Sequence, residues 1–360
     1  AAIWPVLKAD AYGHGAPAVA RTLERAGAEG LCVALLEEGL DLRAAGITVP
    51  VLVMGGYYGP LWRGLEEAVE HGLTPVLYDA AQIERLAGIA RGRGAPAEFH
   101  LKVDTGMSRL GVALPLLTEL LDRIASTPEV RMTGLMSHLA CADAADPSAT
   151  EQQLRHFLAA AEQAKSRGLA PSKLHLGNSA ALLAHPRTHF DFLRPGLMLF
   201  GVSPFYKTDH ERAPSPQVVA ELRPVMRVRT EIVALRALPP GQGVGYGHSY
   251  HAPSERLLAT IPLGYADGLP SRALSNRGQV AIRRRLAPIV GIVSMDLTTV
   301  DVTEIPQVAL GDEVVVLGGQ DGPLGSACVS ANEIAEALGT IPWEVLTSGS
   351  RGVPRSYRAP

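Results

Sequence analysis

A lysine near the amino terminus has the sequence setting of a reactive amine. Lys8 follows the apolar run Ala2–Leu7 and precedes the tetrapeptide ADAY at positions 9–12. A cationic side chain at the end of a buried strand costs free energy, so we expect its amine to be used or paired. Partial burial would lower the lysine pKa and free the amine to form a Schiff base with a carbonyl cofactor. The alternative is a lysine whose charge reaches solvent beyond the strand end.

Other polar residues also follow short apolar runs. They are Lys102, Arg109, His138, Asn178, Ser179 and Arg194. Each has a structural alternative: a core histidine at 138, a helix N-cap at 178–179, and a turn in which Arg109 pairs with Asp104. Their shared position after strand-like runs is harder to obtain by chance, and barrel enzymes carry their chemistry at the carboxyl ends of strands.

The elements that would position these residues alternate along the first 200 residues. The predicted strands are Ile3–Leu7, Gly30–Ala34, Val49–Val53, Thr74–Leu77, Glu98–Val103, Arg131–Ser137, Lys173–Gly177 and Phe192–Arg194. Apolar residues recur at three- and four-residue spacing in the predicted helices Pro17–Ala28, Glu37–Ala45, Leu61–His71, Ala80–Arg91, Leu114–Ser126 and Ala149–Arg167. Eight strands with crossover helices predict an α/β fold with a parallel (β/α)8 barrel of the TIM type; an open doubly wound sheet is the alternative.

The second part of the chain has a different texture. The runs Val225–Val233, Leu257–Pro262, Gln279–Ile282, Ile289–Val293 and Glu313–Val316 are short, β-branched and separated by turn residues, and one helix is predicted at Ser330–Leu338. This pattern is typical of a mainly antiparallel β domain. The segment Ser203–Pro216 is rich in proline, serine and charge, so we place the domains at residues 1–215 and 216–360.

Small residues follow the last two strands of the predicted barrel. The stretches GNSAA at 177–181 and RPG at 194–196 suit the close backbone approach of a phosphate site, which barrels commonly build there. A Schiff-base lysine facing a phosphate site implies pyridoxal 5'-phosphate as the cofactor.

Bulk properties exclude several other classes of function. The net charge of −3 gives no case for binding nucleic acid or an anionic membrane. Three widely spaced cysteines, Cys32, Cys141 and Cys328, argue against a disulfide framework or a metal site. We see no transmembrane run and no signal pattern, and we expect a cytoplasmic protein.

The chain closely resembles the bacterial alanine racemases over nearly its whole length. The matching stretches are VLKADAYGHG at 6–15, LKVDTGMSRLG at 101–111, SHLACAD at 137–143, HLGNSAAL at 175–182, LRPGLMLFG at 193–201, VGYGHSY at 244–250, IPLGYADG at 261–268 and GIVSMDLTTVDVT at 291–303. The resemblance implies a barrel joined to a β domain, and a homodimer whose active sites take residues from both subunits.

The resemblance assigns two catalytic bases. Lys8 would hold pyridoxal phosphate covalently and act on one face of the substrate, and Tyr246 of a second copy would act on the other face. Removal of the α-proton on one face and its return on the other interconverts L- and D-alanine, whose destination would be peptidoglycan.

Further site residues follow from the same resemblance. Arg194 would approach the pyridine nitrogen, His175 would support Arg194, and His138 would bridge towards Tyr246. The residues expected to bind the phosphate are Tyr12, Ser179, Gly196 and Leu197, with Asn178 nearby. Arg109 and the backbone of Met295 would bind the substrate carboxylate, with Tyr265 and Asp296 lining the pocket entrance. Lys102 corresponds to a lysine that carries a carbamate in family members.

The chain departs from the family pattern in four places. It begins seven residues before Lys8, where relatives carry a further β-domain strand, which predicts either a truncated sequence or an absent strand. Trp343 stands where a phosphate-binding tyrosine is common, and an indole can donate but not accept a hydrogen bond. The terminal arginine motif appears as RGVPR at 351–355, shifted by one, and Ser108 replaces a common glycine.

Other functions remain open on the same scaffold. A racemase of serine or of a wider set of amino acids would differ in the volume of the pocket for the substrate side chain. One or a few methylene groups in such a pocket change the free energy of discrimination by only a few kcal/mol. A non-catalytic pyridoxal-phosphate carrier would lack a β domain and a counterpart of Tyr246. A related decarboxylase would need a cysteine in a catalytic loop, and neither Cys141 nor Cys328 lies in a convincing one.

Overall fold

The chain divides into two compact units. The structure, a computed structural model, describes residues 1–56, 63–205, 216–269, 274–322, 325–349 and 353–358. Unit 1 comprises Ala1–Leu199 and Ser203–Glu221, and unit 2 comprises Phe200–Val202 and Leu222–Pro360. Most of the predicted boundary segment lies outside the described residues, so a boundary between 215 and 216 stays a prediction.

Unit 1 is built on a ring of parallel strands. Six pair in the order β2 (Leu31–Val33), β3 (Val51–Val53), β4 (Leu73–Leu77), β5 (Ala97–Asp104), β7 (Val130–Met136) and β8 (Lys173–His175), and the short β6 (Val112–Ala113) adds to β5. β1 (Ala2–Ile3) pairs in parallel with β9 (Phe192–Leu193). A parallel bridge from Val6 to Cys32 joins the first strand to β2. Backbone hydrogen bonds from Asp191 to Leu174 and from Arg194 to Gly177 join β9 to β8.

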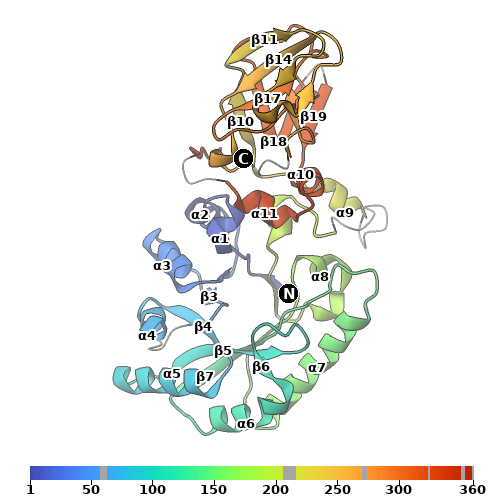
Figure 1. The fold of residues 1–360 in the computed structure, drawn as a ribbon. Coiled ribbons are helices and arrows are strands. Elements are labelled where there is room, and N and C mark those ends of the chain that lie inside the picture. The colour runs from blue at the N-terminus through green and yellow to red at the C-terminus, as the bar shows by residue number, and fades with distance from the viewer. Residues whose placement is uncertain (57–62, 206–215, 270–273, 323–324, 350–352, 359–360) are drawn as a thin grey trace. The chain divides into compact units, whose positions relative to one another are not determined.

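The ring is therefore closed, and the predicted barrel is confirmed; the open-sheet alternative is wrong. The helices cover the outside of the ring (Figure 1). They are α2 (Ala16–Arg25), α3 (Leu36–Ala44), α4 (Arg63–Glu70), α5 (Ala80–Arg93), α6 (Leu114–Ala125), α7 (Ser148–Lys165) and α8 (Ser179–Ala184). A further helix of unit 1, α9 (Pro216–Glu221), follows the barrel in the sequence. The first residues of the helix predicted at 61–71 lie outside the described residues.

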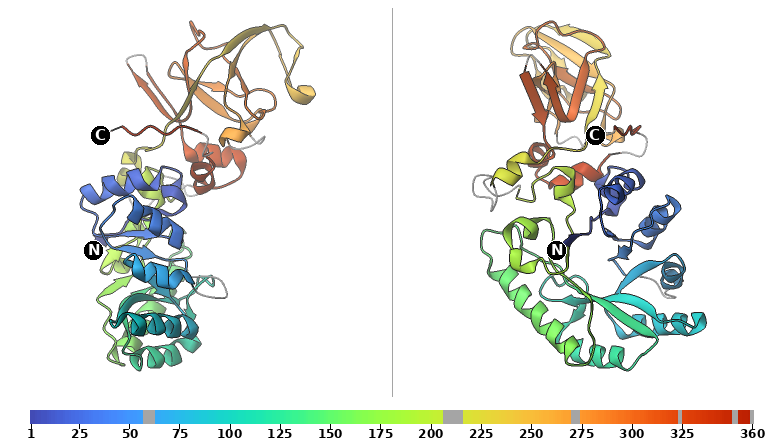
Figure 2. Two further views of the ribbon diagram at one scale, coloured as in Figure 1. Left: turned by 90° about the vertical axis from the view of Figure 1, so that its left-hand side faces the viewer. Right: turned by 180° about the vertical axis from the view of Figure 1, so that it is seen from behind.

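The long helix α7 shows why such segments form helices on this barrel. Its buried residues, which face the strands at three- and four-residue spacing, are Thr150, Gln153, Leu154, Phe157, Ala160 and Ala164. Figure 2 shows α7 running along the outer side of the barrel. Two polar residues in this buried stripe, Thr150 and Gln153, break the apolar pattern.

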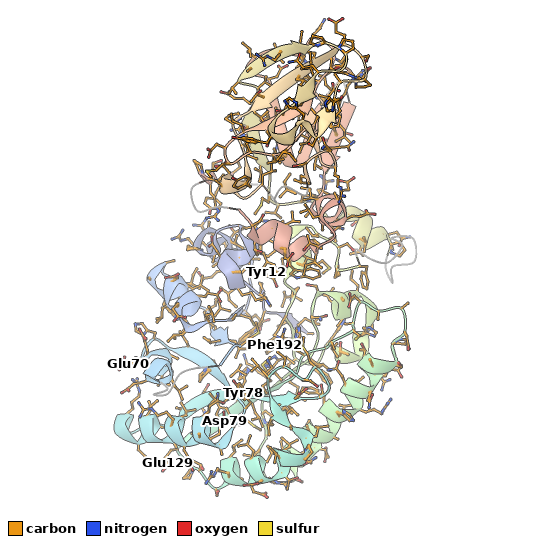
Figure 3. The ribbon with its side chains drawn as sticks, in the orientation of Figure 1. Tyr12, Glu70, Tyr78, Asp79, Glu129 and Phe192 are labelled. Carbon is orange, nitrogen blue, oxygen red and sulfur yellow. The ribbon has the colours of Figure 1, made fainter. Side chains whose placement is uncertain are left out.

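Aromatic side chains fill the ring near its closing seam. Phe192 of β9 lies within the ring of strands (Figure 3). Its ring stacks on Trp4, with centroids 4.4 Å apart, and on His175, with centroids 4.1 Å apart. Stacked aromatic pairs contribute about 0.5–1.5 kcal/mol beyond the area that they bury. The seam therefore has side-chain as well as backbone contacts.

Unit 2 is mainly antiparallel, as predicted. One sheet contains β10 (Val228–Glu231), β18 (Glu313–Gly322), β15 (Gln279–Ile282), β16 (Arg285–Pro288) and β19 (Gly325–Val329), and a second contains β11 (Ala234–Leu238), β14 (Arg256–Ile261) and β17 (Thr298–Asp301). β12 (Gly243–Val244) and β13 (Tyr250–His251) form a hairpin. Two helices, α10 (Ala331–Leu338) and α11 (Pro342–Thr347), follow the strands.

Several strand assignments in unit 2 differ from the sequence-based expectation. The predicted strand Ile289–Val293 is wrong, because only Ile289 forms a bridge and Gly291 takes a positive φ of 76° that ends extended pairing. Six strands among the described residues of unit 2 were not predicted: β11, β12, β13, β16, β17 and β19. β11 has a single buried residue, Leu238, and so lacks the apolar alternation of a half-buried strand. No helix in the described part of the chain is long and apolar enough to cross a membrane.

Candidate active site

The predicted site residues of unit 1 lie at one end of the barrel. Lys8 follows the first strand, Lys102 lies in β5, and His138 comes two residues after β7. His175 is the last residue of β8, and Arg194 directly follows β9. Because these strands are parallel, their carboxyl ends meet at the same end of the ring. The fold thus brings together residues that are up to 186 positions apart in the sequence.

Lys8 opens an unusual turn, α1 (Lys8–Tyr12). The next four residues, Ala9–Tyr12, have positive φ angles between 52° and 54°. Each such residue with a Cβ costs roughly 1–2 kcal/mol. Two carboxylates stabilise the turn: Glu38 accepts from the Ala9 N–H at 2.6 Å, and Asp10 accepts from the Ala16 N–H at 2.7 Å.

The amine of Lys8 is poised to be neutral more often than a surface lysine. Burial, together with the positive charge of Arg109, lowers the pKa of Lys8, and the carboxylate of Glu38 partly opposes this shift. A neutral lysine amine is the nucleophile for a carbonyl and also a proton acceptor. The turn therefore presents a group that can do both.

A buried chain of three side chains starts at Arg194. One guanidinium nitrogen, Nη1, lies 2.6 Å from Nδ1 of His175, and Nε2 of His175 lies 2.9 Å from Nδ1 of His100. Nη2 donates to the carbonyls of Ser137 at 2.7 Å and Leu176 at 3.1 Å. Because arginine has only donors, His175 accepts at Nδ1 and donates from Nε2 to His100.

Burial determines the protonation of these three side chains. It lowers the pKa of Arg194 to about 10 and that of His100 to about 3. Burial and the neighbouring charge of Arg194 also hold the pKa of His175 well below its usual range. Both histidines are therefore neutral at neutral pH, and Arg194 is the charged member of the three.

Tyr12, Ser179 and Gly196 form a cradle of the kind expected for a phosphate. Gly196 donates its N–H to Oγ of Ser179 at 2.8 Å. A Cβ at position 196 would lie 2.2 Å from the hydroxyl of Tyr12, so only glycine allows this approach. Asn178 caps α8 by accepting from the Ala181 N–H at 3.0 Å, and Leu197 is buried beside the cradle residue Gly196. Asn178 is therefore the N-cap of α8, which was the structural alternative for this residue.

The positive charge of Arg109 acts on the amine of Lys102. Burial and the positive charge of Arg109 lower the pKa of Lys102 to about 8. Arg109 itself is exposed. Asp104 does not hold Arg109 by an ion pair in the described residues; Oδ1 of Asp104 instead accepts from the N–H groups of Gly106, Met107 and Ser108, each at 3.0 Å. The carboxylate shapes the turn that leads to Arg109.

The pKa of His138 also departs from its usual range. Burial and then the charge of Arg194 and its neighbours hold it well below the ordinary value for histidine. His138 is therefore neutral, and it can donate from one ring nitrogen and accept at the other.

The predicted site residues of unit 2 lie on three adjoining loops. Tyr246 belongs to a short 3-10 turn, η4 (Tyr246–His248), and Tyr265 begins another, η5 (Tyr265–Asp267). Backbone bonds from Tyr265 to Ser294 and from Ala266 to Met295 tie the second loop to the third. Tyr246, Tyr265 and Met295 are 73 %, 43 % and 54 % exposed, and Asp296 is exposed as well. Trp343 lies in α11 and is half-buried.

Several residues at the site were not found from the sequence. His100 is two residues before Lys102 on the same strand, so strand alternation places both on one face and could have indicated it. Glu38 comes from α3, 29 positions after the amide that it binds, and no local pattern indicates it. The same holds for Gln153, whose amide lies between two site loops.

The residues of unit 1 fit pyridoxal phosphate. A desolvated lysine amine can bind the aldehyde, a glycine-lined cradle with a hydroxyl suits the phosphate, and a buried guanidinium supplies a donor for the ring. A barrel with this set at its strand ends defines the class of pyridoxal-phosphate-dependent barrel enzymes.

Comparison with known proteins narrows that class. The family models of the alanine racemase N-terminal and C-terminal domains match residues 1–204 and 225–357. An alanine racemase of Sorangium cellulosum is 57% identical over 360 residues, which cover 99% of this chain and 92% of the relative. The chain belongs to the alanine racemase family.

Solved structures agree with this assignment. The alanine racemase from Streptomyces lavendulae has a TM-score of 0.90 and 35% identity, with 100% of this chain and 91% of that chain covered. An alanine racemase from Bartonella henselae, solved with covalently bound pyridoxal phosphate, has a TM-score of 0.82 and 31% identity, covering 97% and 90% of the two chains.

Proposed function

We propose that this chain interconverts L-alanine and D-alanine with pyridoxal phosphate held in the barrel of unit 1. The observation that carries the proposal is the desolvated amine of Lys8 at the barrel end that also holds the cradle of Tyr12, Ser179 and Gly196. When bound, the cofactor withdraws electron density from the substrate α-carbon and makes its proton acidic.

Lys8 and Tyr246 are the proposed bases. Nζ of Lys8 takes or returns the α-proton on one face, and Oη of Tyr246, from a second copy of the chain, does so on the other. The support for a second copy is the exposure of Tyr246, Tyr265 and Met295, since clustered apolar side chains in water usually mark a contact surface. In this proposal residues 1–215 bind the cofactor, and residues 216–360 complete the site of the partner subunit.

Arg194 is proposed to face the pyridine nitrogen. A guanidinium cannot readily give up a proton, so with the cofactor bound Arg194 would leave the ring nitrogen unprotonated and a weaker electron acceptor. The neutral His175 fixes the orientation of Arg194 through the bond at Nδ1. His138, also neutral, is proposed to bridge towards Tyr246. Asn178, Leu197 and Trp343 are proposed to flank the phosphate.

Recognition of the substrate carboxylate is proposed for Arg109 and the backbone of Met295, with Tyr265 and Asp296 at the entrance. A planar guanidinium suits a planar carboxylate. We further propose that Lys102 carries a carbamate: its nitrogen bonds to the carbon of CO2, the departing proton goes to solvent, and the new anion holds Arg109 in place.

The amount of carbamate on Lys102 should depend on pH. Only the neutral amine reacts with CO2, so carbamate should be lost as the pH falls below the Lys102 pKa of about 8. At pH 7, removal of CO2 is expected to raise the KM for alanine and added bicarbonate to restore it. Intact-protein mass measures the modification. Lys102→Met is the control: if it still responds to bicarbonate, the carbamate lies elsewhere.

The activity itself is tested by following the optical rotation of an L-alanine solution with purified protein and pyridoxal phosphate. We expect decay to zero, from either enantiomer. A yellow protein with a flat trace would contradict the alanine assignment, and the same assay with serine would then test that substrate. We propose a cytoplasmic homodimer that supplies D-alanine for peptidoglycan; the three widely spaced cysteines suit a reducing compartment.

A further inference from the structure

We infer that Gln153 of α7 is a positioning residue that sets the affinity for the substrate carboxylate by joining the Arg109 loop to the His138 loop. The inference rests on the proposed role of Arg109. Gln153 is 3 % exposed, although it lies on a helix that otherwise turns mostly apolar side chains to the strands. A buried amide that is not hydrogen-bonded would be costly, and its partners show what it holds.

Gln153 contacts both loops through one amide. Nε2 donates to the carbonyl of His138 at 2.9 Å and to Oγ1 of Thr105 at 3.2 Å. Oε1 accepts from the N–H of Ala140 at 2.9 Å. The bonds therefore hold the segment from His138 to Ala140 on one loop and fix Thr105, the first residue after β5, on the other.

The contact extends through Thr105 to Arg194. Thr105 is fully buried, and its Oγ1 lies 2.8 Å from Oγ of Ser137, whose carbonyl accepts from Arg194. One turn further along α7, His156 lies with Nδ1 3.0 Å from the carbonyl of Thr105. Gln153 and His156 of the same helix therefore both bind Thr105.

Fixing Thr105 fixes the residues that lead to Arg109. Asp104 and the three N–H groups that it binds, at positions 106 to 108, form a turn between Thr105 and Arg109. A Cβ at Gly111 would lie 2.6 Å from the backbone nitrogen of Asp104, so the loop returns against the strand end that it leaves. The turn therefore moves as a unit, and its anchor determines where the exposed guanidinium of Arg109 lies.

Only an amide of this length can make the three bonds together. Methionine has nearly the same shape and no N–H donor, and a glutamate carboxylate is acceptor-only and adds charge. Loss of the anchor should displace Arg109, whereas neither proposed base, Lys8 or Tyr246, is among the groups that the Gln153 amide binds. The expected effect is on KM rather than on kcat.

The test compares Gln153→Met with Gln152→Met, its exposed neighbour on the same helix. In the holoenzyme, we expect Gln153→Met to raise the KM for alanine and the Ki for propionate together, each about tenfold, with kcat changed less than about threefold. Gln152→Met should change neither. Propionate has the carboxylate without the amine and so reports the anion site alone.

A second pair of variants covers the case in which Gln153→Met does not fold. Thr105→Val removes the hydroxyl that Gln153 binds and should raise KM and Ki in the same way. Thr105→Ser keeps the hydroxyl, so both constants should stay at the values of the unaltered enzyme. If Gln153→Met and Thr105→Val lower the thermal midpoint while KM and Ki stay unchanged, Gln153 is merely structural and the inference is overturned.

Arg109→Leu separates this inference from the proposed function. A raised KM in Arg109→Leu with unchanged KM in Gln153→Met and Thr105→Val would overturn the positioning role alone. An unchanged KM in Arg109→Leu would overturn the proposed role of Arg109 and the inference with it.

Discussion

Replacing Tyr246 by phenylalanine is expected to lower the rate of racemisation by about 10²–10⁴ and to leave the cofactor bound. The phenol is the proposed base on one face of the substrate, and phenylalanine keeps the ring but has no proton to exchange. Tyr246 is in unit 2, whereas the proposed cofactor ligands Lys8, Tyr12 and Ser179 are in unit 1, so cofactor binding should not depend on it.

The informative readout is exchange of the α-proton in heavy water, followed by NMR for each enantiomer separately. One enantiomer should lose its exchange far more than the other, because Lys8 still serves the other face. Tyr250→Phe, in the same hairpin region, is the matched control and should keep full activity. Equal and undiminished exchange from both enantiomers would show that Tyr246 is not a base.

Replacing Lys8 by alanine is expected to abolish both covalent attachment of the cofactor and racemisation, with a loss at the upper end of the same range or beyond. Reduction with borohydride followed by mass analysis measures the attachment. Lys165→Ala, at the exposed end of α7, should retain both. An added small alkylamine should partly replace the missing amine; attachment that survives in Lys8→Ala would place it on another lysine.

Mixing these two variants tests the shared site. If each site takes Lys8 from one subunit and Tyr246 from the other, a dimer of Lys8→Ala with Tyr246→Phe has one intact site and one doubly altered site. Random exchange of equal amounts should then restore about a quarter of the unaltered activity. No restoration after subunit exchange would place both bases within one chain.

Much of the barrel could be predicted because its strands are continuous apolar runs. For example, the predicted strand Glu98–Val103 corresponds to β5 at Ala97–Asp104, and the helix predicted at Leu114–Ser126 to α6 at Leu114–Ala125. Burial on both faces of a parallel strand removes polar residues from it, so the pattern survives in a single sequence. In unit 2 the pattern was weaker: β11 is largely exposed, and Gly291 interrupts the run that resembled a strand.

The candidate site could be predicted as a set of residues but not as a geometry. The left-handed turn after Lys8 gives four consecutive non-glycine residues a positive φ, which such residues rarely adopt. Its stabilisation by Glu38 depends on a contact 29 positions away. The series of contacts from Arg194 through His175 to His100 likewise arises only when residues of β5 and β8 and the residue after β9 meet in the closed ring. Local sequence carries no signal for contacts of this kind.

The closing seam of the barrel has a kinetic consequence. The segment before Lys8 pairs on one side through Val6 with Cys32, and on the other side through β1 with Phe192 and Leu193. About 190 residues separate the two paired strands, and closing so long a loop is slow. Until that length of chain has been synthesised, the segment before Lys8 lacks one of its two neighbouring strands, so the reactive amine reaches its final surroundings only after the last strand of the barrel has formed.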